Sequence, residues 1–581
     1  MQKNNPNVFL RLLRYLKPHI GTMALTMFLV LIVTVTTLVR PILIGDAMDA
    51  ITEGAAFSAV VRLFVIYIVL LLLGTACNAL QMWLLQKTGQ DIILTLREEL
   101  FAHIHRLSLR FFDITPVGRV VTRVTNDVES INELFSSVLV NMVKNVVMII
   151  GLAGVMLFMQ WKLALISFVL LPLVFWLTTV FTKLYRSTHR ITRTKVSALN
   201  TYLSENLSAM RLIQLFHREK EKQHEFDGRS EDLFRSNFRE IVVYGTFQPM
   251  IYWVSIASLA SVLGFGGHQV IAGTITIGTL YIFTSYVQSF YSPIQTLTEQ
   301  FSTLQAAMAA GEKIFTLLDE EPLVLPPEEP VSLPEVKGRI EFEHVWFSYD
   351  GEEWVLKDVS FVIEPGTTAA FVGATGAGKS SILNLIGRYY DIQKGRITID
   401  GVDIRSIPLA DLRKAVGQVQ QDVFLFTGNI RGNIRLKNEE ISDEQIRAAA
   451  EFVNADGFIR SLEHGYEEAV TERGSTLSAG QRQLLSFART LAHDPAVLVM
   501  DEATANIDTE TEALIQDAMA RLMKSRTTVI VAHRLSTIQH ADRIMVMHKG
   551  RLRESGTHQE LLAQGGIYKK LYDLQLAGME G

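Results

Sequence analysis

The sequence predicts a two-part fold, an α-helical membrane domain of six spans fused to an α/β domain of the P-loop NTPase class. Three observations predict it: long uncharged apolar runs crowd into the first half of the 581 residues, a proline-rich stretch follows them, and a glycine-rich motif then stands between a predicted strand and a predicted helix. We expect residues 1–318 to form the membrane domain, 319–338 a linker and 339–581 the α/β domain.

The composition narrows the class of protein. Hydrophobic residues make up 48% of the chain and the mean hydropathy is +0.22, which is high for a soluble chain of this length. The net charge of −5 gives no support for nucleic-acid binding. The single cysteine, Cys77, excludes an intrachain disulfide and a cysteine metal cluster.

Six apolar runs approach the length of about 20 residues that a helix needs to cross a bilayer. They are Met23–Val39, Leu63–Leu85, Leu134–Phe158, Leu163–Phe181, Val242–Gly267 and Ile275–Ile294. The last is the weakest by hydropathy and is rich in Tyr and Phe. Lys144 interrupts the third run, where a charge is costly unless it pairs, snorkels or faces a water-filled cavity. Snorkelling and a water-filled cavity are therefore two alternative explanations of Lys144.

The loops between the runs predict the orientation. The two long loops, after the second and fourth runs, carry many Lys and Arg residues, whereas the short loops on the other side carry few or none. The positive-inside bias therefore places both termini and both long loops in the cytoplasm. The stretch Asp319–Gly338 contains five prolines and cannot be a helix interior or a central strand, so we interpret it as the linker.

The motif Gly373-Ala374-Thr375-Gly376-Ala377-Gly378-Lys379-Ser380 follows the apolar strand Ala369–Val372 and precedes the helical run Ser381–Ile386. This is the context that a P-loop requires. The glycines let successive backbone N–H groups face phosphate oxygens, and the N-terminus of the following helix adds a favourable dipole. Lys379 is placed for the β and γ phosphates and Ser380 for Mg²⁺.

A second apolar strand, Ala496–Met500, ends in Asp501-Glu502. An acidic residue at the end of a buried strand beside a P-loop is expected to associate with Mg²⁺, and Glu502 can polarise an attacking water molecule. Acidic residues commonly end strands, so this pair indicates chemistry only because the P-loop precedes it.

The stretch Leu477-Ser478-Ala479-Gly480-Gln481, shortly before that strand, resembles the signature motif of ATP-binding cassette (ABC) proteins. Other positions resemble further elements of that family: the adenine-stacking aromatic at Tyr349, the Q-loop glutamine at Gln421, the exporter loop at Thr471–Gly474, the D-loop at Ala505–Asp508 and the switch histidine at His533. In the first half, Phe111–Asp127 resembles exporters of the type IV fold. The resemblance covers nearly the whole chain.

The resemblance implies a head-to-tail dimer with ATP and Mg²⁺ held between two ATPase domains. Glu502, His533 and Gln421 would be catalytic. The nucleotide-binding residues would be Tyr349, Gly373, Thr375, Gly376, Ala377, Gly378, Lys379, Ser380, Ser381, Asp501, Gln481 and Asp508, together with Ser478 and Gly480, which would serve the site of the opposite chain. Ser380 and Gln421 would be Mg²⁺ ligands, with Asp501 acting indirectly.

The signature departs from the family pattern, because Ala479 stands where glycine is usual, while Glu502 is intact. Heterodimeric bacterial exporters often pair a chain of this kind with one whose signature is standard and whose glutamate position is faulty. We therefore expect a different half-transporter as partner, with a homodimer as the alternative.

As a function, the resemblance implies ATP-driven export of lipophilic compounds or drugs by alternating access, from a bacterial cytoplasmic membrane. The partners would then be the second half-transporter, membrane lipid and a lipophilic small molecule. Two alternatives stay open: a lipid or glycolipid flippase, which one lipid class should stimulate, and an ATP-gated channel or regulator, which should pass current without uphill transport. Helix packing explains the aromatic sixth run as well as a substrate pocket does.

Overall fold

A computed structural model describes residues 6–333, 336–501, 509–531 and 538–577. By their contacts these residues form two compact units. The first comprises Met1–His105 and Gly118–Asp319, and the second comprises Arg106–Val117 and Glu320–Gly581. Each unit is described by itself.

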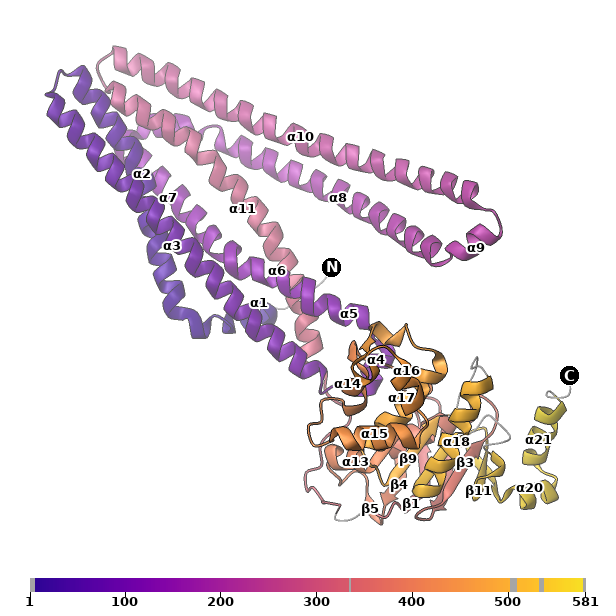
Figure 1. Ribbon diagram of the computed structural model, residues 1–581. Helices are drawn as coiled ribbons and strands as arrows, with labels where there is room; N and C mark the ends of the chain where they lie inside the picture. Colours follow the sequence, from indigo (N-terminus) through magenta and orange to yellow (C-terminus); the bar gives the residue numbers. More distant parts are fainter. Residues whose placement is uncertain (1–5, 334–335, 502–508, 532–537, 578–581) are drawn as a thin grey trace. The chain divides into compact units, whose positions relative to one another are not determined.

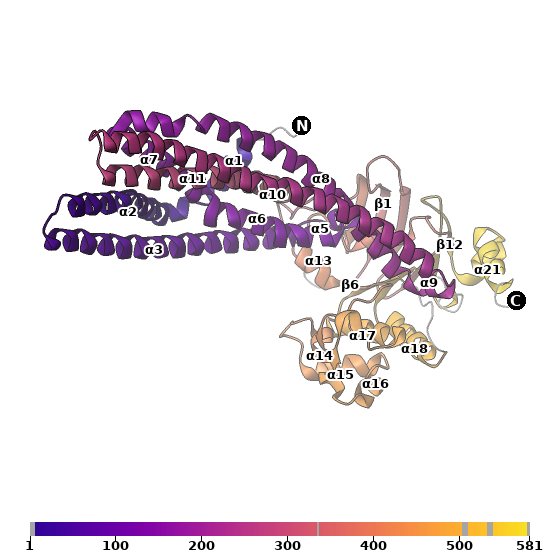
Figure 2. The ribbon, with the colours of Figure 1, turned by 90° about the horizontal axis from the view of Figure 1, so that it is seen from above.

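In its described residues, the first unit contains helices and no strand (Figure 1). Its helices are α1 (Pro6–Arg14), α2 (Ile20–Thr52), α3 (Phe57–Ile104), α5 (Val117–Thr122), α6 (Val128–Glu133), α7 (Leu139–Phe168), α8 (Leu171–Ser208), α9 (Met210–Leu215), α10 (Glu219–Ile271) and α11 (Ile277–Leu318). Wider π-helical turns join α5 to α6 and α6 to α7. Helices α2 and α3 run side by side, and so do α8 and α10 (Figure 2). The short helix α9 connects α8 to α10 at one end of that pair.

Within the described residues, four helical segments are long and apolar enough to cross a membrane: Lys17–Thr52, Phe57–Ile104, Val117–Phe168 and Glu219–Ile271. They contain the first, second, third and fifth predicted runs. The fourth run is divided between two helices, because α7 ends at Phe168 and α8 starts anew at Leu171. Pro172, in the first turn of α8, has no N–H group to continue the preceding helix.

The sixth predicted run lies in α11, whose polar aromatic residues lower its hydropathy and yet are buried. Tyr286 is 1% exposed, and its hydroxyl group donates to the carbonyl oxygen of Leu38 in α2 at 2.6 Å. Phe290 packs against Phe168 of α7 with ring centroids 5.6 Å apart. These residues of α11 therefore pack against other helices and not against lipid. This explains why hydropathy alone identifies the sixth span only weakly.

The second unit contains two main sheets. The antiparallel sheet has the order β2-β1-β4-β5, with β1 (Ile340–Phe347), β2 (Leu356–Ile363), β4 (Lys394–Ile399) and β5 (Val402–Asp403). The larger sheet has the order β12-β11-β3-β10-β9-β6, with β3 (Thr368–Val372), β6 (Val416–Val419), β9 (Val497–Asp501), β10 (Thr527–Val531), β11 (Arg543–His548) and β12 (Arg551–Gly556). All neighbours in it are parallel except β11 and β12. A short pair joins β7 (Gly428–Asn429) to β8 (Ala469–Val470).

The larger sheet is buried on both faces, and every residue of β3 and β10 is buried. One core fills the space toward the antiparallel sheet. Helices α12 (Lys379–Ile386) and α13 (Leu409–Ala415) pack on this core. A second core lies under the other helices, which are α14 (Ile430–Arg435), α15 (Asp443–Phe452), α16 (Asp456–Ser461), α17 (Ala479–Ala492), α18 (Thr509–Ser525), α20 (His558–Gln564) and α21 (Ile567–Ala577). Helix α4 (Leu109–Ile114) also belongs to this unit by its contacts, although it lies between α3 and α5 in the chain.

Candidate functional site

The glycine-rich motif forms the loop between β3 and α12, as the sequence predicts. Its backbone has positive φ at Gly373 (+148°), Gly376 (+80°) and Gly378 (+97°). A Cβ atom at Gly373 would lie 2.2 Å from the carbonyl oxygen of Met547, and one at Gly378 would lie 2.7 Å from a methyl carbon of Leu356. Only glycine fits these two positions, so the glycine pattern fixes a tight loop whose N–H groups can gather around an anion.

Lys379, the first residue of α12, folds its side chain back into that loop. Its Nζ atom donates to the carbonyl oxygens of Gly373 at 2.7 Å and Ala374 at 3.1 Å. Burial lowers the pKa of this amine below its ordinary value, and the negative charge of Asp501 opposes the shift. The loop thus holds a desolvated cation at the place where phosphate oxygens would be received.

The neighbouring side chains divide into exposed and buried ones. Thr375 and Ser380 are exposed, whereas Ala377 and Ser381 are buried. The hydroxyl group of Ser381 lies 3.0 Å from that of Tyr349. The ring of Tyr349 meets Phe347 and Tyr390 edge-on, with centroids 4.7 Å and 5.0 Å apart. The P-loop helix and Tyr349 are therefore in direct contact, while the stacking of Tyr349 on adenine stays a prediction.

Asp501 and Gln421 lie at the ends of adjacent parallel strands. Asp501 is the last residue of β9, and Gln421 is exposed two residues beyond β6. Because β3, β9 and β6 are parallel, their carboxyl ends and the P-loop share one edge of the sheet. Glu502, Asp508 and His533 lie outside the described residues; along the chain, Glu502 follows β9 directly and His533 follows the end of β10 by two residues.

The signature residues form the start of α17. Ser478 is its N-cap: the Ser478 hydroxyl oxygen accepts from the Gln481 N–H at 3.2 Å, and the Ser478 N–H donates to the Gln481 side chain at 2.9 Å. This capping box gives Gln481 a structural role. Because the Ser478 oxygen acts as acceptor, its own proton is free to be donated. Ser478 and Ala479 are exposed, and Gly480 is buried.

The signature and the P-loop belong to different parts of the unit. Helix α17 packs against α14, α15, α18 and β6, whereas α12 packs against β9 and β10. Arg489 ties α17 to the segment after β6, since it donates to the carbonyl oxygens of Asn433 at 2.8 Å and Phe424 at 3.0 Å. The two motifs are thus built on separate helices of one chain.

The donor set fits a nucleotide with Mg²⁺. The loop offers backbone N–H groups and Lys379 for phosphate, while the exposed Ser380 hydroxyl, the Gln421 amide and the Asp501 carboxylate are oxygen ligands of the kind that Mg²⁺ prefers. Among the described residues, no group of three or more His, Cys, Asp or Glu side chains could hold a metal ion by itself. A Mg²⁺ ion here would therefore depend on phosphate oxygens for part of its coordination.

Sequence reasoning missed Tyr390 beside this site, and with it the pairing of Tyr390 with Asp113. The Tyr390 hydroxyl group donates to the Asp113 carboxylate of α4, and the Tyr390 ring lies against Tyr349. Burial, followed by the bond to Asp113, raises the pKa of Tyr390, so its hydroxyl keeps its proton. Tyr390 follows the P-loop helix closely in the chain, which could have indicated that it lies near the site. Its partner Asp113 could not be predicted in this way, because it lies 277 residues away in the chain.

Comparisons with known proteins agree with this geometry. Residues 23–294 match the family described as the ABC transporter transmembrane region, and residues 356–505 match the family described as ABC transporter. The chain is similar to the ABC transporter ATP-binding protein exp8 of Streptococcus pneumoniae (41% identical over 576 residues, 98% of each chain). It is also similar to an ATP-dependent lipid A-core flippase of Syntrophus aciditrophicus (35% over 569 residues, 98% of this chain and 94% of the relative). A solved structure of a bacterial Atm1-family ABC exporter with ATP bound is similar in fold, with a TM-score of 0.77, 28% identity, and 96% and 98% of the two chains covered.

Proposed function

This chain belongs to the ABC transporters as an exporter half-transporter that hydrolyses ATP and works as a dimer, and from that premise we propose that it exports lipophilic compounds across a bacterial cytoplasmic membrane. Both termini would lie in the cytoplasm, as the charge of the loops predicts. The observation that carries the substrate class is a cavity in the membrane unit.

The cavity has a volume of about 560 Å³ and lies between α8, α10 and α11. Phe181 packs against Phe247 and Tyr185 against Tyr244, with ring centroids 5.2 Å and 6.0 Å apart, so these pairs give it an aromatic wall. The α11 side is polar and consists of Gln295, Thr298, Glu299, Ser302 and Gln305. A cavity of this size and lining suits a small amphipathic molecule.

For the hydrolytic step, we propose that Lys379 and the P-loop N–H groups bind the phosphates and that Ser380 and Gln421 hold Mg²⁺, with Asp501 assisting. Bound Mg²⁺ would neutralise charge on the phosphate oxygens. Glu502 would take the proton of the attacking water, and His533 would steady the γ-phosphate. The Ser478 hydroxyl oxygen already accepts from the Gln481 N–H. Its proton would be donated to the γ-phosphate of the ATP that is bound to the opposite chain.

The separation of the signature from the P-loop supports a site that two chains complete together. The α9 region presents a second surface for the partner, because Leu212, Leu215 and Phe216 are 56%, 71% and 64% exposed. Apolar side chains gathered at the tip of a helical hairpin suit docking onto a partner's ATPase domain. We propose a different half-transporter as that partner, on the evidence of Ala479 and the intact Glu502.

A lipid flippase is the second candidate, favoured by the same amphipathic cavity and by the name of the relative from Syntrophus aciditrophicus. One experiment tests both: the chain is placed in inverted vesicles, alone and with candidate partner chains, and transport of a lipophilic dye and of a labelled lipid is followed with ATP. Dye transport that Glu502→Gln abolishes supports the exporter, and lipid transfer without dye transport supports the flippase. ATP hydrolysis by the correctly paired dimer with transport of neither would refute both.

A further inference from the structure

The P-loop helix α12 ends in a left-handed turn formed by an arginine. Gly387 is the C-cap, and Arg388 follows it with φ of +47°. The Arg388 N–H donates to the Leu385 carbonyl at 3.0 Å, and the Tyr389 N–H donates to the Asn384 carbonyl at 3.0 Å, which is the Schellman pattern. Glycine is the usual residue at this position, because any side chain disfavours positive φ. Contacts of the arginine side chain must therefore offset the unfavourable backbone conformation.

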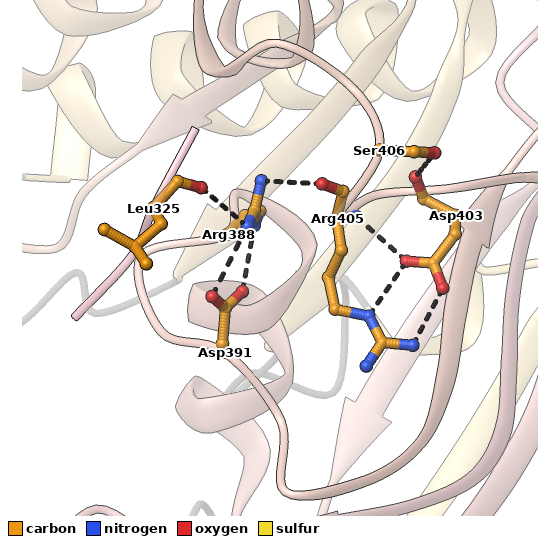
Figure 3. Close-up of polar contacts among 6 residues, drawn as sticks. All are labelled: Leu325, Arg388, Asp391, Asp403, Arg405 and Ser406. Atoms are coloured by element: carbon orange, nitrogen blue, oxygen red, sulfur yellow. Dashed lines mark hydrogen bonds and ion pairs between the residues drawn. The ribbon is translucent and has the colours of Figure 1, made fainter. Parts of the chain in front are cut away.

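The side chain of Arg388 is 4% exposed and reaches three different parts of the unit (Figure 3). Its Nε atom donates to Asp391 at 2.9 Å, within the same loop. One terminal nitrogen donates to the Leu325 carbonyl oxygen at 3.0 Å, and the other donates to the Arg405 carbonyl oxygen at 3.2 Å. A planar guanidinium can hold several acceptors at fixed angles, as a lysine cannot.

Leu325 belongs to the chain segment that leads from the membrane unit, which ends at Asp319, to β1, which starts at Ile340. A second bond holds the same segment, since the Val331 N–H donates to the Ser406 carbonyl oxygen at 2.9 Å. Figure 3 shows Arg388 between Leu325 and the turn that carries Ser406, with the Arg405 side chain bonded to the Asp403 carboxylate in that turn. The covalent connection is thus anchored next to the end of α12 despite its prolines.

The same loop also carries Tyr390, which contacts Asp113 of α4 and the ring of Tyr349. Tyr349 in turn contacts Ser381 in the first turn of α12. The five residues Gly387–Asp391 therefore contact the two segments that lead to the membrane unit, namely the linker through Arg388 and α4 through Tyr390. Both contacts start at the end of the helix that begins with the P-loop lysine.

We propose that Arg388 is a positioning residue for coupling: it fixes the linker to the C-terminal end of the P-loop helix, so that movement of this helix on nucleotide binding and release is passed to the membrane domain through the linker as well as through α4. The polar contacts of the guanidinium are with Asp391, Leu325 and Arg405, so the proposed role acts through the linker and not by binding nucleotide or the transported compound. The inference rests on the proposed coupling of hydrolysis to transport.

The first test follows the linker itself and does not depend on transport. The full chain, in its dimer in lipid nanodiscs, is treated with a glutamate-specific protease, and cleavage after the exposed Glu328 is timed by mass spectrometry. Arg388→Gly suits the left-handed backbone but releases Leu325, so cleavage should accelerate several-fold. The matched control is Lys437→Gly, since Lys437 also has positive φ (+60°) and is exposed; it should leave cleavage unchanged.

The second test compares ATP consumption with transport for the same variants. Arg388→Gly should keep the KM for ATP and the basal kcat near those of the wild type, lose substrate stimulation of hydrolysis, and transport roughly ten-fold less per ATP. Arg388→Lys retains a donor for Asp391 and should restore part of the coupling. A residue needed only for folding would instead lower basal hydrolysis and stimulation together.

The outcomes separate the ideas. Wild-type transport per ATP in Arg388→Gly, or unchanged linker cleavage, would overturn the role of Arg388. Equal loss of basal hydrolysis and of stimulation in both arginine variants would overturn it too, because the effect would then be one of stability. If the wild-type dimer hydrolyses ATP but transports nothing, the proposed function fails, while the cleavage test still decides whether Arg388 holds the linker.

Discussion

The Nζ atom of Lys379 lies 2.7 Å from the carbonyl oxygen of Gly373, so the P-loop lysine is bonded to the same loop whose N–H groups it would assist. The amine is already buried and desolvated before any phosphate is considered. Binding a phosphate then exchanges two carbonyl acceptors for charged oxygens, which hold a cation more strongly. Affinity for nucleotide should depend heavily on this one side chain.

Lys379→Ala should therefore weaken ATP binding. Loss of charge-assisted hydrogen bonds of about 1.5–3 kcal/mol corresponds to roughly a ten-fold to hundred-fold rise in Kd. Titration with a fluorescent ATP analogue measures it. Lys414→Ala, on the exposed surface of α13, is the control and should bind normally. Unaltered affinity in Lys379→Ala would count against the P-loop assignment.

Glu502→Gln should abolish turnover while ATP still binds. The amide keeps the shape of the side chain but cannot accept the proton of the attacking water, so kcat should fall by roughly 100-fold or more. Phosphate release and nucleotide binding are measured on the same paired preparation. Glu463→Gln removes one exposed carboxylate elsewhere and should leave both unchanged. Hydrolysis at the wild-type rate would refute the role of Glu502.

Gly373→Ala should disrupt the P-loop, since the new Cβ would lie 2.2 Å from the Met547 carbonyl oxygen. The strain should cost about 1–3 kcal/mol and shift the loop, which lowers both thermal stability and ATP affinity. Gly457→Ala is the control, because a Cβ there meets nothing within 4 Å. It lies in α16 and should be neutral or slightly stabilising by up to about 1 kcal/mol. Normal ATP affinity in Gly373→Ala would contradict the loop geometry.

His493, the C-cap of α17, should make the stability of the ATPase unit depend on pH. Burial, with a smaller effect of the nearby Arg489 charge, lowers the pKa of His493 from its ordinary value of 6.5. Below that value the unfolded chain binds a proton that the folded chain resists, so stability is lost as pH falls. As the pH is lowered from about 7 to about 5, the thermal unfolding temperature should fall more steeply for the wild type than for His493→Gln. Parallel curves would show that His493 does not contribute.

Leu215→Glu should impair the dimer and leave the fold of the chain intact. Leu215 is 71% exposed, so a charge there costs little in the isolated chain, whereas burying it against a partner would be expensive. Paired ATP hydrolysis and transport should drop several-fold. Leu574→Glu is the matched control, with a leucine that is 70% exposed on α21, and should be silent. Equal behaviour of the two variants would argue against docking through α9.

Local patterns allowed part of this protein to be predicted. The P-loop, its flanking strand and helix, and the strand that ends at Asp501 were correct because glycine spacing and apolar runs act within a few residues. Four of the six apolar runs also lie within single helical stretches, and the sixth starts two residues before α11. The fourth is divided between α7, which ends at Phe168, and α8, which starts at Leu171 with a proline in its first turn, and an apolar run by itself does not show such a break.

The sequence by itself determined the family, the ATP-hydrolysing chemistry and the division into helical and α/β parts, because each rests on contiguous residues whose backbone preferences and side-chain chemistry are local. Only the tertiary structure decided that Tyr390 meets Asp113 and that Arg388 holds Leu325. These partners lie 277 and 63 residues apart in the chain. The pattern of residues along the sequence does not indicate such pairs, because they form only when folding brings distant segments to the end of one helix.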